Sequence, residues 1–130
     1  MREFLNGEFI DTVFSEEEQG RIVETLLENN DNFGNFGGND TVDRVFLLSI
    51  SEVDEFMRGD APGVLQRARI AYRVGVRTES SAWWLRSPGV GGSLTAGGNA
   101  ASVSSQGIVS SSRVDDGSVG VRPAIWLYSE

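Results

Sequence analysis

Serine hydroxyls and carboxylates are the side chains of this chain that could do chemistry. Its 130 residues include 19 acidic and 11 basic residues, every basic one an Arg, and no Cys, His or Lys. Thiol nucleophiles, Schiff-base amines and the usual general base near neutral pH are therefore excluded, as are zinc sites built on Cys or His. We predict a protein that is not an enzyme and uses no cofactor, with a carboxylate-based glycan hydrolase as the alternative.

Two clusters of oxygen-bearing side chains raise the question of calcium. Asn39, Asp40 and Asp43 form one cluster, and Asp115 and Asp116 form the other. A calcium site needs six or more oxygens in a defined loop, and no EF-hand spacing is present. We therefore predict solvated loops and turns here, and no metal.

Arginines are grouped in the second half of the chain. Four follow at short spacing: Arg67, Arg69, Arg73 and Arg77. They predict an Arg-rich surface or internal pairing with carboxylates, and an anion site is the alternative. Arg86 and Arg122 have matching places in two aromatic segments, and a buried Arg must be paired or hydrogen-bonded. We expect both to hold acidic groups or loop carbonyls.

Charge and hydropathy limit the partners of the chain. The net charge is −8, and most acidic residues lie within 3–60, which argues against nucleic acid as a partner. No apolar run approaches the ~20 residues that span a bilayer, so no membrane insertion is predicted. Residues 1–20 mix apolar and acidic positions, unlike a secretory signal.

Apolar spacing predicts two helices near the start of the chain. Apolar residues recur at roughly helical spacing over 2–14. The sequence Ser-Glu-Glu-Glu at 15–18 is a capping box that opens a second helix, which we expect to end near residues 29–30. A similar pattern at 51–54 predicts a further short helix.

Short strands are predicted after the helices. The apolar run 45–50 indicates a buried strand, and 82–85 and 121–128 indicate two more. Around a reversal at 105–107, alternation directs Ala101, Val103 and Val109 inward and Ser102, Ser104 and Ser110 outward. Asp116-Gly117 predicts a tight turn. Helices followed by antiparallel strands define an α+β class, and we predict one domain over 1–130.

In the last third of the chain, two segments rich in apolar and aromatic residues flank a segment rich in Ser and Gly; we call the two flanking segments the frame. Trp83 to Gly89 opens the frame, Gly120 to Leu127 closes it, and residues 90–119 hold eight Ser, six Gly and no aromatic. We interpret 1–89 and 120–130 as scaffold, and 90–119 as a variable display segment. The predicted ligand-binding residues are Ser102, Ser104, Gln106, Ile108, Ser110, Ser112, Arg113 and Asp115. Ile108 should face outward, where an apolar side chain gains little except contact with a partner.

Six segments together resemble a large family from gut Firmicutes and their phages: Phe4 to Phe9, Phe14 to Glu18, Gly38 to Thr41, Val45 to Ser49, Trp83 to Gly89, and Gly120 to Leu127. Those domains have a C-type-lectin-like fold of the formylglycine-generating-enzyme type, and some look like the variable proteins of diversity-generating retroelements. The resemblance implies two N-terminal helices, short antiparallel strands and a hypervariable surface that binds a protein or glycan. It does not carry over enzyme activity, because the oxidase branch needs Cys and the iron-dependent branch needs His.

The resemblance also raises expectations about assembly. Relatives carry strand-forming sequence before the segment that is Phe4-Leu5-Asn6 here, so we expect the first strands to be either missing or supplied otherwise. If they are missing, we expect the last strand to expose an edge. Such an edge favours an oligomer. A structural or assembly module of a phage or cell surface is a further alternative, and we expect a cell surface or virion as the location. Because strong paratopes use Tyr and Trp anchors, which 90–119 lacks, we predict weak binding by this variant.

Overall fold

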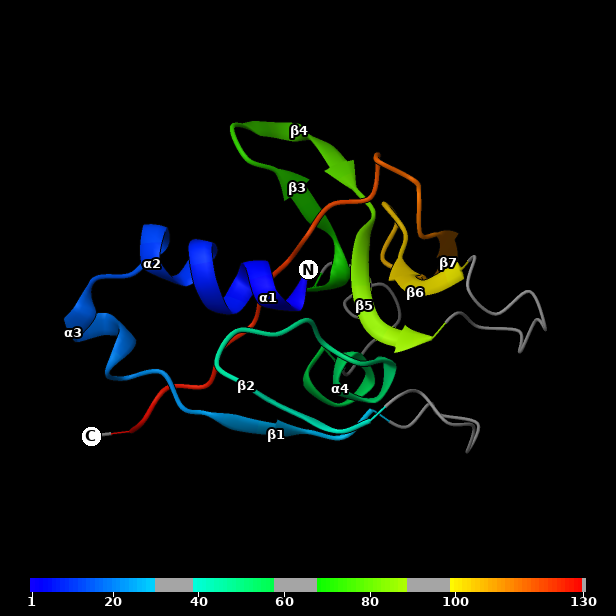
Figure 1. The fold of residues 1–130 in the computed structure, drawn as a ribbon. Coiled ribbons are helices and arrows are strands. Elements are labelled where there is room, and N and C mark those ends of the chain that lie inside the picture. Colours follow the sequence, from blue (N-terminus) through cyan, green and yellow to red (C-terminus); the bar gives the residue numbers. More distant parts are fainter. Residues whose placement is uncertain (30–38, 58–67, 89–98, 130) are drawn as a thin grey trace.

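The computed structural model describes residues 1–29, 39–57, 68–88 and 99–129, which form a mixed α and β structure (Figure 1). The helices are α1 (Arg2–Phe4), the π-helix η1 (Leu5–Phe9), α2 (Ile10–Val13), α3 (Glu16–Gln19) and α4 (Ile50–Phe56). The strands are β1 (Thr25–Leu27), β2 (Thr41–Asp43), β3 (Ala71–Arg73), β4 (Val76–Ser81), β5 (Trp83–Pro88), β6 (Asn99–Val103) and β7 (Val109–Arg113). They pair antiparallel as β1-β2, β3-β4 and β5-β6-β7. The α+β class is confirmed.

The N-terminal helical segment follows the sequence pattern. Helices α1, η1 and α2 run on without a break over residues 2–13 and bury Leu5 and Ile10. The segment ends because Phe14 is extended, with φ −115° and ψ 137°. Ser15 then caps α3, since its Oγ accepts from the Glu18 amide while the Glu18 carboxylate accepts from the Ser15 amide. The predicted capping box is confirmed.

The predicted second helix is much shorter than expected. α3 ends at Gln19, and the apolar residues that follow lie in an extended segment and in β1. Leu26 pairs with Val42, and Ile22 forms a bridge with Leu127. The apolar spacing of residues 22–27 suits a helix as well as a strand, and pairing with these distant partners makes the segment extended.

Helix α4 begins earlier than predicted. Its N-cap is Ser49, whose Oγ accepts from the Glu52 amide at 3.2 Å. Ser49 and Glu52 have the spacing of a capping box, but the Glu52 carboxylate binds Arg86 instead of reaching back. The prediction of a cap at Ser51 is therefore wrong by two residues.

The predicted strands at 45–50 and 121–128 are not regular strands, because each segment pairs only through isolated bridges and Ile50 is the first residue of α4. Phe46 bridges to Ala124, and Val45 lies buried beside it. The backbone of Val45 is occupied by a side chain, because Asn6 donates to its carbonyl at 2.8 Å and accepts from its amide at 2.9 Å. Pro123 has no amide hydrogen to extend a ladder. Both features limit strand pairing here.

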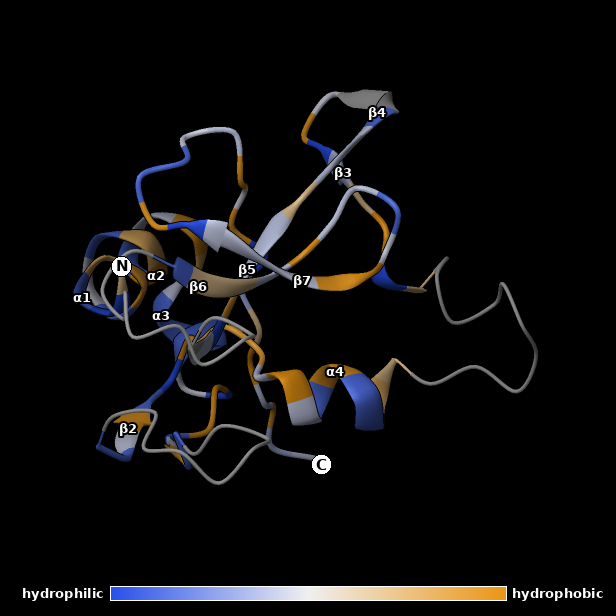
Figure 2. Ribbon diagram, turned by 90° about the vertical axis from the view of Figure 1, so that its right-hand side faces the viewer, coloured by the Kyte–Doolittle hydropathy of each residue, from blue (hydrophilic) through white to orange (hydrophobic). Residues whose placement is uncertain are grey.

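Strand β5 separates two apolar clusters. Successive strand residues point to opposite faces, so Trp83 packs with α4 and β6 residues while Trp84 contacts the cluster under the N-terminal helices. Helix α4 closes the first cluster with Ile50 and Val53, and Figure 2 shows apolar and hydrophilic residues together on this helix. Trp83 is a core residue with 1% of its surface exposed, whereas Trp126 is half exposed. No helix in the described ranges is long and apolar enough to cross a membrane.

Candidate functional site

The β6–β7 hairpin is the described part of the predicted display segment. Its register runs from Asn99 opposite Arg113 to Val103 opposite Val109. The reversal at 105–107 is confirmed, since the Gly107 amide donates to the Ser104 carbonyl at 2.9 Å. Gly107 has a φ of 83°, a conformation that L side chains rarely adopt. Residues 90–98 of the segment lie outside the described residues.

The inner face of the hairpin anchors it to the scaffold. Ala101 and Val103 are fully buried in the cluster that contains Trp83, as the alternation predicted. Ser102, however, is 1% exposed, so the prediction that its side chain points outward to solvent is wrong. β6 is the central strand, and the Ser102 hydroxyl lies 2.8 Å from that of the half-buried Ser112. A buried hydroxyl needs such a partner, which makes this pair structural.

The tip and the outer strand of the hairpin carry the exposed side chains. Ile108 is 49% exposed, as predicted, and Gln106 and Ser110 are exposed with it. Ser104 is half-buried and builds the turn, since its Oγ accepts from the amides of Gln106 and Ile108. Among the described strands, β7 lies at one edge of the three-stranded sheet, and the segment 121–128, for which an exposed edge was expected, is not a regular strand.

Arg113 and Asp115 continue the exposed surface past β7. Their side chains pair at 3.0 Å while both remain largely exposed. We use the name display set for five residues of this surface: Gln106, Ile108, Ser110, Arg113 and Asp115. The structure thus keeps five of the eight predicted ligand-binding residues at the surface and assigns hydrogen-bonding roles within the hairpin to Ser102, Ser104 and Ser112.

A hydrogen-bonded turn ends the display segment, as Asp116-Gly117 predicted. The Asp116 carboxylate accepts from the Ser118 amide at 2.9 Å and from its hydroxyl at 2.6 Å. These bonds, the hydroxyl first, lower the pKa of Asp116. A lowered pKa in the folded state gives stability at neutral pH that is lost as the pH falls through that pKa.

Replacing Ser118 by Ala is expected to raise the Asp116 pKa toward its ordinary value, because one of the two donors is lost. An NMR titration of the Asp116 carboxylate measures this. Ser105→Ala, in the exposed turn of the hairpin, is the control and should leave that pKa unchanged. An Asp116 pKa that is identical with and without the Ser118 hydroxyl would contradict the turn geometry.

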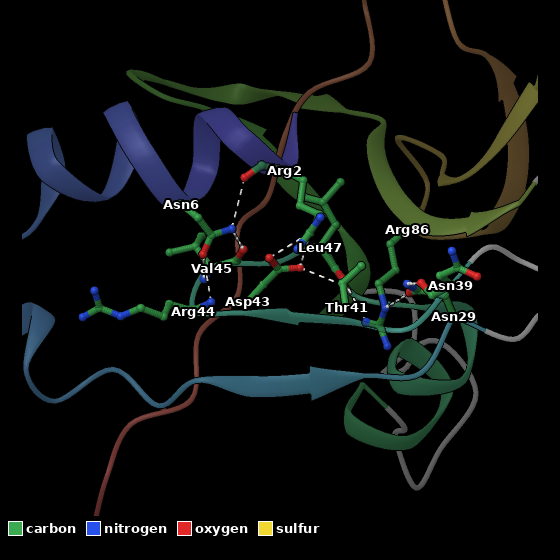
Figure 3. Close-up of polar contacts among 10 residues, drawn as sticks. All are labelled: Arg2, Asn6, Asn29, Asn39, Thr41, Asp43, Arg44, Val45, Leu47 and Arg86. Atoms are coloured by element: carbon green, nitrogen blue, oxygen red, sulfur yellow. Dashed lines mark hydrogen bonds and ion pairs between the residues drawn. The ribbon is translucent and has the colours of Figure 1, made fainter.

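A cavity of about 280 Å³ lies between the N-terminal helix and β2. Figure 3 shows the buried Asp43 carboxylate facing Arg2 and Thr41. Arg2 Nε donates to both carboxylate oxygens at 2.7 and 2.8 Å, and the Thr41 hydroxyl donates at 2.8 Å. The bond to Asp43 is the main reason that the Arg2 pKa is raised. Asp43 is the one carboxylate among the described residues that line this cavity, and Arg2 already neutralises it.

Arg86, in contact with the same cavity, has the predicted clamp role. Its Nη1 donates to the Leu47 carbonyl at 3.0 Å, and its Nε donates to Asn29 at 3.2 Å (Figure 3). Nη1 also donates to the Glu52 carboxylate at 2.7 Å. Arg86 therefore joins β5 to α4 and to the end of β1. Sequence spacing predicted a clamp but not these partners, which lie far away in the chain.

The residues of the cluster Asn39, Asp40 and Asp43 accept hydrogen bonds from other protein groups. Asp40 accepts from the Asn29 amide at 3.1 Å, and Asn39 accepts on its carbonyl from the Asn29 side chain. Within the described ranges, no three acidic side chains are grouped so that they could hold a metal ion.

A second cavity, of about 530 Å³, lies beside the β3–β4 hairpin. Arg73 and Arg122 line it together with Tyr72 and Trp83. Arg122 donates to the Ala68 carbonyl at 3.3 Å, and its guanidinium carbon lies 4.9 Å from the centre of the Trp83 ring. The carbonyl contact fits the prediction for Arg122. Neither cavity has two carboxylates among its described lining residues, so neither supports the hydrolase alternative.

These features define an α+β domain with a polar hairpin displayed at one edge. The chain belongs to the family described as "Domain of unknown function (DUF6273)", whose profile matches residues 1–129. No curated protein and no solved structure matches the chain.

Proposed function

We propose that the chain is a non-enzymatic ligand-binding domain of C-type-lectin-like fold whose β6–β7 hairpin is part of the binding surface. The observation that carries this proposal is the contrast between the two sides of the hairpin. Ala101 and Val103 are fully buried, while the apolar side chain of Ile108 is 49% exposed at the tip. Because Ile108 lies at the surface among short polar side chains, a partner can contact it without disturbing the buried face of the hairpin.

The hairpin also meets the physical requirement for a surface that varies. Side chains of the display set lie at the surface, and substitutions at such positions usually change stability by ~0.5 kcal/mol or less. Backbone pairing and the hydroxyls of Ser102, Ser104 and Ser112 help to hold the hairpin together. Residues of the display set can therefore change while the backbone that carries them is kept.

Diversification by a retroelement is the finer part of the proposal. Adenine-directed rewriting converts Asn codons into codons for Ser, Gly, Asp, Val, Ala or Thr, and these residues dominate 90–119. We expect a near-identical template repeat beside a reverse transcriptase gene, differing from this gene at adenines. A genome that has the gene without such a repeat would contradict diversification but not ligand binding.

A matched pair of surface substitutions tests the binding surface. We expect an array of glycans and proteins to reveal a weak partner, and Ile108→Ser to lower its affinity about tenfold, because a buried apolar side chain contributes ~1.5–3 kcal/mol. The control is Leu26→Ser, because Leu26 is 64% exposed on β1. A tightly bound partner whose affinity is unchanged by substitutions at Ile108 and at the other residues of the display set would rule out this binding surface.

A further inference from the structure

The cavity beside the β3–β4 hairpin is separate from the display set. In Figure 1 this hairpin projects from the body of the fold, and the chain that follows β7 passes beside it. That passing chain is held in place by Gly120, whose carbonyl accepts from the Trp84 amide at 3.0 Å and whose amide donates to the Ala82 carbonyl at 2.7 Å. The cavity walls are therefore built from paired backbone on both sides.

The described residues that line this cavity include two arginines and no acidic side chain. The arginines are Arg73 and Arg122. No ion pair joins either Arg to an acidic side chain in the part of the chain that the structure describes. This stands out in a protein whose net charge is −8, and whose Arg2, Arg69, Arg86 and Arg113 are all paired.

Arg122 is held ready for a planar anion. Its guanidinium lies over the Trp83 ring at 4.9 Å, and Nη1 makes one long bond of 3.3 Å to a carbonyl. Contact with the indole covers a face of the guanidinium, whereas a carboxylate binds at the edge, where the N–H groups point. Burial without a counter-charge lowers the pKa of Arg122, so an anion would relieve an existing cost of desolvation.

The remaining walls suit an apolar body. Ile70, Val74 and Val121 line the cavity with aliphatic residues, and Tyr72 and Trp83 are its aromatic lining residues. Mostly apolar walls with a few charged groups are typical of small-molecule sites. The geometry points to a binding site for a small organic carboxylate, with Arg122 and Arg73 holding the carboxylate and the apolar walls holding its flat or ring-shaped body.

Benzoate is a suitable probe, with benzamide as its neutral match in shape. We expect benzoate to shift the Trp83 indole N–H resonance saturably in NMR titrations of the whole chain, and benzamide to leave it nearly unchanged. Sulfate, which lacks the apolar body, should bind more weakly than benzoate. No saturable shift with benzoate, an equal shift with benzamide, or equal affinity for sulfate would overturn the proposal.

Two substitutions assign the site. Arg122→Gln is expected to weaken benzoate binding about tenfold or more, because bonds to charged groups are lost. Arg73→Gln is expected to weaken benzoate binding as well. Because Arg73 is exposed, this variant should fold and can test the site even if Arg122→Gln does not fold. Arg21→Gln, at an exposed Arg that belongs neither to the cavity lining nor to the display set, is the control. Benzoate binding that is equal in the Arg73 and Arg21 variants would contradict the site, whatever the outcome for the display set.

Discussion

Replacing Trp83 by Ala is expected to lower the free energy of unfolding by about 3–5 kcal/mol. Trp83 is 1% exposed, packs in the cluster with Val53 and Val103, and donates its indole N–H to the Arg69 carbonyl at 2.8 Å. The substitution removes this contact area and leaves the carbonyl without its donor. Since small domains are stable by only ~5–15 kcal/mol, the variant should unfold at much lower urea concentration.

Trp126→Ala is the matched control for Trp83. Trp126 is 47% exposed and contacts Phe56 edge-to-face, with ring centroids 5.5 Å apart. Such a pair contributes ~0.5–1.5 kcal/mol beyond its buried area, so a clearly smaller loss is expected. Equal losses for the two substitutions would show that β5 does not separate the apolar clusters as described.

Replacing Glu52 by Ala is expected to cost about 3–5 kcal/mol, because it leaves a mostly buried Arg without its counter-charge. The Arg86 side chain is 15% exposed and that of Glu52 is 18% exposed, so water screens the pair poorly. Urea unfolding at neutral pH measures the loss. A double substitution, Glu52→Leu with Arg86→Met, should recover part of it, since an apolar pair avoids the desolvation of both charges.

Asp115→Ala is the control for the buried pair. The Arg113–Asp115 ion pair has an N–O distance of 3.0 Å, but unlike Arg86 and Glu52 both of its side chains are mostly exposed. Exposed pairs contribute ~0–1 kcal/mol. A loss for Glu52→Ala as small as that for Asp115→Ala would contradict the clamp between β5 and α4.

Local patterns predicted local structure well. The capping box at Ser15 and the reversal before Gly107 need only neighbouring residues, and both formed as predicted. The alternation of Ala101 and Val103 was also informative, because one face of β6 is in the core.

Distant partners account for what the sequence did not predict. The apolar residues at 22–27 suited a helix, but pairing with β2 and with Leu127 made this stretch extended. Ser102 was expected to face solvent, yet it lies in a central strand whose second face is covered as well. The bonds from Asn6 to Val45 cross 39 residues, and no local signal indicates them.

A library varied at the display set tests the central claim most directly. The five positions would be randomised to include Tyr and Trp, and members selected against lysozyme as a test protein, because aromatic anchors are what the hairpin lacks. We predict that most members keep the urea midpoint of the parent chain, and that selected binders lose their affinity when these positions revert. Widespread unfolding in the library, or affinities that survive reversion, would contradict a binding surface on the β6–β7 hairpin.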